Sequence, residues 1–248
     1  RTVGTILLGD NTGNNGGFTI LGSPLTLDVT TGMALVSKRY STLADTIAAD
    51  LVLNDDLTIS NGVNGGAAAA LIISGGMSGA YNVQKTGSGW LILDGNNTFG
   101  SLLISAGTVQ VGRASTSGTL GYGPVTNNSM LQFFRSDDFV VTNNVIGSGI
   151  FRQLNGSGSV TLLGSNTMGS LLLGAGRLES ALILGAGSTN LVTGDVQLGV
   201  LGGTGLGQYG RLVVSSGATL RAVNMYLGNA SGSTGDVYQA GGVVSIAI

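Results

Sequence analysis

The sequence predicts an all-β fold, a parallel β-helix (β-solenoid) in which short strands stack coil upon coil. Three observations indicate it: apolar residues occur in short runs bounded by turn-forming residues, 45 of the 248 residues are glycine, and one block of sequence recurs at a constant spacing. A single coil of a solenoid cannot bury its own apolar side chains, but stacked coils bury them in a common core. Abundant glycine suits their tight corners, because many corners require a positive φ.

The individual strands follow from apolar runs bounded by Gly, Asn, Ser and Thr. Such runs occur at 5–9, 25–29, 51–59, 71–74, 90–95 and 101–107. The segment 41–50 (STLADTIAAD) is the best candidate for a helix, with Ser41 as its N-cap, but the strand-like runs on both sides argue against a helix there. A globular β-sandwich is the alternative architecture. It would need longer alternating strands and more aromatic residues than the 5% present.

The recurring block sets the length of a coil. Residues 87–109 and 156–178 match without a gap at 13 of 23 positions, at an offset of 69 residues, which is three coils of 23. At about 22 residues per coil, the 248 residues form roughly eleven coils of a single domain, 1–248, with internal repeats near 83–112 and 152–181. The two blocks should therefore occupy equivalent positions, three coils apart. The residues expected to point inward in them are Leu91, Leu93, Val160 and Leu162.

Corner residues recur within the same blocks. Asn97 and Asn166 fall at equivalent positions and are predicted to form turns and to bond through their side-chain amides. Gly95 and Gly164 accompany them as structural turn residues.

Strand alternation also predicts a candidate interface. If Leu91 and Leu93 point inward, Trp90 and Ile92 point outward, and by the same argument so do Leu103 and Leu172. Exposed apolar patches mark interaction sites, so these four residues are expected to contact a partner. The alternative is that a loop or a bulge covers them.

The composition excludes several classes of protein. With 42% hydrophobic and 9% charged residues, the chain is too apolar for a disordered segment. It has no His and no Cys, so histidine or thiol catalysis, disulfides and His or Cys metal sites are excluded. The net charge is −2 and the ten basic residues are scattered, so no nucleic-acid partner is expected. No apolar run reaches the ~20 residues of a membrane-spanning helix.

The segment 83–112, VQKTGSGWLILDGNNTFGSLLISAGTVQVG, resembles the passenger-associated transport repeat of bacterial autotransporters. The stretches 118–133 and 217–246 are similar to segments of related bacterial surface proteins. The resemblance implies a right-handed parallel β-helix at the bacterial cell surface or outside the cell. The motif positions are held by Lys85, Gly87, Gly89, Leu91, Leu93, Gly95, Asn97, Thr98, Phe99, Gly107 and Thr108.

No catalytic constellation emerges, so we expect no enzymatic activity and no cofactor. The adjacent carboxylates Asp55-Asp56 and Asp137-Asp138 point to opposite faces if they lie in strands, and the calcium-binding nonapeptide repeat is absent. The predicted function is structural: a self-assembling building block of a bacterial surface fibre or layer. The alternative is an autotransporter-like adhesin or display passenger that binds a host, a glycan or a surface.

The two ends of the sequence lead to further expectations. The chain begins at Arg1 without a signal peptide, which predicts a mature or trimmed product, and it stops without a recognisable cap. Open strands at both ends leave two alternatives. Either more coils of the same chain follow, or copies stack end to end, which we favour slightly.

Overall fold

The computed structural model is described for residues 1–9, 16–154, 158–174, 180–199, 208–229 and 232–246. The fold is all-β and forms a β-solenoid of about nine turns. The strand pairs in register are parallel, as in Thr58 beside Leu35 and Gln84 beside Thr58. This confirms the predicted fold class. The right-handed sense implied by the resemblance stays a prediction.

The chain divides into two compact units. Unit 1 comprises Arg1–Arg113 and Ser117–Met130, and unit 2 comprises Ala114–Thr116 and Leu131–Ile248. The single domain expected over 1–248 stays a prediction beside this division.

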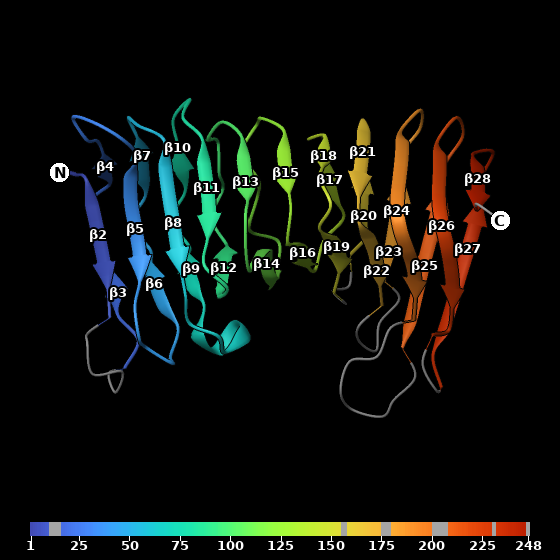
Figure 1. The fold of residues 1–248 in the computed structure, drawn as a ribbon, viewed down its shortest axis with the longest axis horizontal. Coiled ribbons are helices and arrows are strands. Elements are labelled where there is room, and N and C mark those ends of the chain that lie inside the picture. Colours follow the sequence, from blue (N-terminus) through green and yellow to red (C-terminus); the bar gives the residue numbers. More distant parts are fainter. Residues whose placement is uncertain (10–15, 155–157, 175–179, 200–207, 230–231, 247–248) are drawn as a thin grey trace. The chain divides into compact units, whose positions relative to one another are not determined.

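Unit 1 is built from three stacks of short parallel strands, which Figure 1 shows in blue to green. A four-stranded sheet contains β1 (Thr2–Val3), β4 (Leu25–Leu27), β7 (Leu51–Leu53) and β10 (Met77–Ser78). A second stack contains β2 (Thr5–Leu8), β5 (Ala34–Lys38), β8 (Leu57–Asn61), β11 (Val83–Thr86), β13 (Leu102–Ile104) and β15 (Val125–Asn127). A third contains β3 (Thr19–Ile20), β6 (Asp45–Ile47), β9 (Leu71–Ile73), β12 (Trp90–Leu93) and β14 (Thr108–Ser115). A 3-10 turn, η1 (Gly66–Ala69), precedes β9.

Unit 2 continues with parallel stacks. A five-stranded sheet contains β17 (Phe139–Val141), β20 (Val160–Leu162), β23 (Ser180–Leu184), β25 (Tyr209–Val214) and β27 (Thr234–Gln239). The other strands are β16 (Met130–Arg135), β18 (Val145–Ile146), β19 (Ile150–Gln153), β21 (Ser165–Met168), β22 (Ser170–Leu173), β24 (Thr189–Leu198), β26 (Thr219–Leu227) and β28 (Val243–Ile246).

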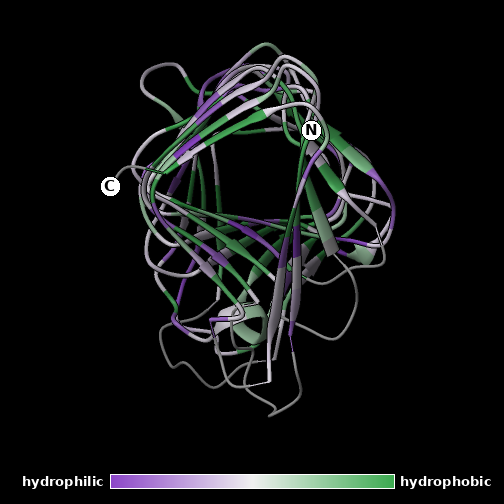
Figure 2. Cartoon of the chain, turned by 90° about the vertical axis from the view of Figure 1, so that its right-hand side faces the viewer, coloured by the Kyte–Doolittle hydropathy of each residue, from purple (hydrophilic) through white to green (hydrophobic). Residues whose placement is uncertain are grey.

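Alternate residues of the strands fill the core. Leu51, Leu53, Leu57 and Ile59 are completely buried, and the residues between them are partly exposed. Figure 2 shows hydrophobic stretches in green along many strands, interrupted by hydrophilic purple. The segment 41–50, the best candidate for a helix, contains the strand β6 instead, and the predicted runs from 5–9 to 101–107 contain strands. Leu, Ile and Val thus supply the burial that holds the coils together.

The expected number of roughly eleven coils is wrong, since the solenoid has about nine turns. Many coils are longer than the expected 22 residues. Thr5 pairs with Leu35, a step of 30 residues, whereas Val83 pairs with Leu102, a step of 19. The long steps hold loops between strands, and loop length is only weakly constrained by its entropic cost.

The two repeat blocks do not occupy equivalent faces. Leu91, Leu93, Val160 and Leu162 are all buried, as predicted. However, β12 pairs with β9 and β14, whereas β20 pairs with β17 and β23 in the separate five-stranded sheet. Strand alternation fixes which residues point inward on any face, but it does not specify which face a strand joins.

Candidate interaction surface

The structure covers part of the interface expected from the sequence. Ile92 is 2% exposed and packs with Ala70 and Ile72, against which Ala44 and Trp90 also pack. Trp90 remains partly exposed and lies close to η1. A Cβ atom placed on Gly66 would be 3.9 Å from the Trp90 indole ring. The alternative of a covering segment therefore holds for Ile92, which is not accessible to a partner.

Leu103 and Leu172 are partly exposed but isolated in polar rows. Leu103 lies between Gln84 and Thr126 in register. Leu172 lies between Arg152 and Gln197. Trp90 and Ile92 belong to a different sheet from Leu103, so these residues do not form one patch.

The two predicted corner asparagines make matching contacts between coils. The Oδ1 atom of Asn97 accepts the Met77 N–H (3.0 Å), and the Oδ1 atom of Asn166 accepts the Val145 N–H (3.0 Å). The amide nitrogen of Asn97 donates to the carbonyl oxygens of Gly95 (3.1 Å) and Thr119 (2.7 Å). Both side chains are buried, so each satisfies backbone groups that would otherwise lack partners.

The two glycines beside them are required for different reasons. At Gly95 an added Cβ would lie 2.1 Å from the Gly75 carbonyl oxygen, so the close approach of two coils excludes a side chain. Gly164 has φ +73°, which favours glycine.

Three of the four adjacent carboxylates brace neighbouring coils, and the fourth pairs within its own coil. Asp55 accepts the Val29 N–H (2.6 Å) and Asp56 accepts the Asn82 N–H (2.8 Å). Asp137 pairs with Arg135. Asp138 accepts the backbone N–H and the hydroxyl of Ser159, and these bonds lower the pKa of its carboxyl. The four carboxylates are thus occupied in structural contacts.

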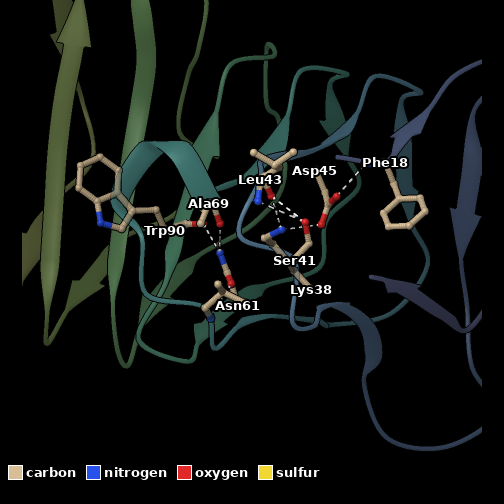
Figure 3. Close-up of polar contacts among 9 residues, drawn as sticks. Phe18, Lys38, Ser41, Leu43, Asp45, Asn61, Ala69 and Trp90 are labelled. Atoms are coloured by element: carbon tan, nitrogen blue, oxygen red, sulfur yellow. Dashed lines mark hydrogen bonds and ion pairs between the residues drawn. The ribbon is translucent and has the colours of Figure 1, made fainter. Parts of the chain in front are cut away.

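A buried ion pair lies where β5 ends and β6 begins (Figure 3). Lys38 Nζ is 2.6 Å from Asp45 Oδ2, and both side chains are fully buried. Lys38 also donates to the Leu43 carbonyl (2.7 Å), and the other carboxylate oxygen accepts the Phe18 N–H (2.7 Å). The pair therefore holds two loop segments against the interior: the one around Leu43, between β5 and β6, and the one around Phe18, before β3.

Lys85, the lysine of the repeat motif, is buried, and its amine bonds to backbone carbonyl oxygens. Its Nζ donates to the carbonyl oxygens of Thr86 (2.6 Å), Gly87 (2.7 Å) and Ala106 (3.3 Å). Burial lowers the pKa of this amine from 10.5 to about 8. The side chain secures the corner between β11 and β12.

A largely apolar stripe that the sequence did not predict crosses the five-stranded sheet of unit 2, with Thr161 as its polar member. We call it the outer stripe; one residue from each strand contributes, in continuous register: Val140, Thr161, Ile183, Val213 and Tyr238. The neighbouring residues of these strands, such as Leu162 and Leu212, are buried in the core, so the stripe faces outward. Val140 is 51% exposed and Tyr238 is 55% exposed, and the three residues between them are partly exposed.

Charged residues border the outer stripe at one end. Arg211 and Asp236 are paired in register on β25 and β27, and the guanidinium of Arg211 lies 5.7 Å from the ring centre of Tyr238. Period-two alternation in five separated strands was the signal for the stripe. It was visible only strand by strand, because pairing between distant segments brings its members together.

Among the described residues, no group of three or more His, Cys, Asp or Glu side chains could hold a metal ion. Within the described residues, no helix is long and apolar enough to cross a membrane. No family model, no curated protein and no solved structure matches the chain.

Proposed function

We propose that this protein is a structural β-solenoid that assembles with copies of itself through the outer stripe. The observation that carries the proposal is a row of outward side chains in register across five strands, four of which are apolar, with the two ends of the row exposed. Removing apolar side chains from water is favourable and would stabilise an assembly that covers the stripe. Exposed contiguous apolar patches mark interaction surfaces.

The spacing of the stripe supports a second copy as the partner. Parallel strands lie about 4.8 Å apart, so the stripe presents one side chain at each such interval. A surface with the same interval can interdigitate along its whole length, as facing sheets do in a β-sandwich at about 10 Å separation. The outer stripe of another copy is a surface of this kind.

The resemblance of 83–112 to the passenger-associated repeat supports a place at the bacterial surface, in a fibre or layer, and no enzymatic activity is proposed. The end-to-end association expected from the sequence stays a prediction beside the lateral contact. The alternative function, an autotransporter-like adhesin passenger, would use a lateral surface for a ligand.

Sedimentation velocity over a concentration series tests the proposal. We expect the wild-type protein to sediment as an assembly whose size grows with concentration. Ile183→Lys should shift the distribution toward the monomer, because assembly would then bury an unpaired ammonium group. Leu103→Lys is the matched control, since Leu103, like Ile183, is a partly exposed aliphatic residue of an outward row. A wild-type protein that stays monomeric, or equal assembly of both variants, contradicts the proposal.

A further inference from the structure

A groove of about 460 Å³ opens beside the corner that follows β5. Its lining residues belong to unit 1 and those of the outer stripe to unit 2, so its role does not depend on the proposed assembly. We call it the Tyr40 groove; its lining combines a cation, an aromatic ring and two hydroxyls: Ser37, Lys38, Arg39, Tyr40, Ser60, Gly62 and Val63.

The chain holds Arg39 and Tyr40 outside by anchoring the residues around them. The buried ion pair with Asp45 draws the Lys38 side chain inward. The Arg39 N–H donates to the Leu8 carbonyl (2.7 Å), and the Ser41 N–H donates to the Arg39 carbonyl (2.7 Å). This turn leaves Arg39 and Tyr40 exposed at the groove.

Tyr40 adopts a strained backbone conformation. Its φ is +58°, in the left-handed region that glycine occupies without penalty, and its side chain is 58% exposed. The tyrosine ring therefore gains little from burial that would offset the strain. An observed strain of this kind at an exposed aromatic points to a role outside the fold.

The lining of the groove also carries the positive charge of Arg39 and two serine hydroxyls, of Ser37 and Ser60. Lys38 is neutralised by Asp45, whereas the ion pairs found among the described residues do not include Arg39. Ser37 and Ser60 are paired in register on β5 and β8, so their hydroxyls recur at about the 4.8 Å strand spacing.

We infer that the Tyr40 groove binds an acidic saccharide through a uronic acid residue. The Arg39 guanidinium pairs with the sugar carboxylate, which it can hold through two parallel hydrogen bonds. The Tyr40 ring packs on the apolar face of the sugar, and Ser37 and Ser60 exchange hydrogen bonds with its hydroxyls. The volume lies within the range of about 300–1,000 Å³ that small-ligand sites occupy.

The test is calorimetric titration of the protein with a galacturonic acid trisaccharide and with the uncharged galactose trisaccharide. We expect binding of the charged trisaccharide, at least about tenfold weaker binding of the neutral one, and a similar loss in Arg39→Gln, because each change removes the charge-assisted bonds. Arg113→Gln, which alters an exposed arginine of the same unit, is the control and should bind like the wild type.

Tyr40→Gly separates binding from folding. Glycine relieves the strain at φ +58°, so the unfolding midpoint should stay within a few degrees of the wild type while affinity falls at least about tenfold. The inference is overturned if millimolar trigalacturonate does not bind, if Arg39→Gln binds as tightly as the wild type, or if Tyr40→Gly retains full affinity. A poly-glutamate peptide that binds as well as the trisaccharide would also overturn it, because the groove would then recognise carboxylates without the sugar.

Discussion

Breaking the buried ion pair between Lys38 and Asp45 should destabilise unit 1 strongly. Lys38→Met removes the ammonium and leaves the Asp45 carboxylate fully buried, where it still accepts the Phe18 N–H. Asp45→Asn leaves the ammonium buried, where it still donates to the Leu43 carbonyl. In both variants an uncompensated charge stays in the interior.

The magnitude follows from this desolvation. Removing one partner of a buried pair costs about 3–5 kcal/mol, because the remaining charge has lost its hydration without a counterion. The double variant Lys38→Met/Asp45→Asn leaves no charge in the pocket. Its loss should therefore be at least about 2 kcal/mol smaller than the sum of the two single losses.

Urea unfolding followed by tryptophan fluorescence measures these losses. Trp90 is the single tryptophan of the chain and lies in unit 1 with the ion pair, so its signal reports the unfolding of that unit. Leu103→Ala, at a partly exposed position of unit 1, controls for unspecific effects. If either single variant loses less than about 1 kcal/mol, or if the two losses are additive, the reasoning about the buried pair is refuted.

Three further predictions use the same assay or a thermal melt. Because the folded-state pKa of Lys85 is lowered from 10.5 to about 8, the unfolded chain keeps a proton between these two pH values that the folded chain has lost; the free energy of unfolding should rise with pH across this window, by at most about 3 kcal/mol. Lys85→Met should abolish the rise, and an identical pH dependence in both proteins would contradict the assignment. Leu93→Ala should cost about 2–5 kcal/mol, because the side chain is fully buried, and a loss below about 1 kcal/mol would place it outside the core. Asn97→Ala should cost about 1–3 kcal/mol by leaving the Met77 N–H unsatisfied, and a melting temperature equal to that of the wild type would show that water replaces the amide.

The features predictable from the sequence are those that short-range patterns determine. Alternation placed Leu93 and Leu162 in the core without any knowledge of the sheet they join. The repeated Asn97 and Asn166 both bond through their side chains to the coil before them, although Asn166 lies within β21 and not at the turn expected for it. These results depend on a residue's nearest neighbours along the chain and on one adjacent coil.

The features that the sequence did not predict depend on distant segments. Ile92 is covered by residues around η1, which lie more than 20 positions earlier in the chain. The alanine-rich sequence of that segment does not predict which residue it packs against. The faces of β12 and β20 differ because loop lengths vary from coil to coil. The outer stripe depends on the register of five strands spread over about a hundred residues, so its members are not recognisable one by one.

Disulfide cross-linking through Ile183→Cys tests lateral self-assembly most directly. The chain has no cysteine, so the introduced thiol is the only one, and Ile183 lies on β23, the middle strand of the five. In a two-fold pairing of stripes, the central residue meets its own counterpart whether the axis runs along the stripe or across its centre. Mild oxidation should convert Ile183→Cys to covalent dimers at micromolar concentration while Leu103→Cys remains monomeric. Equal dimer formation by the two variants, or none by Ile183→Cys, would contradict assembly through the outer stripe.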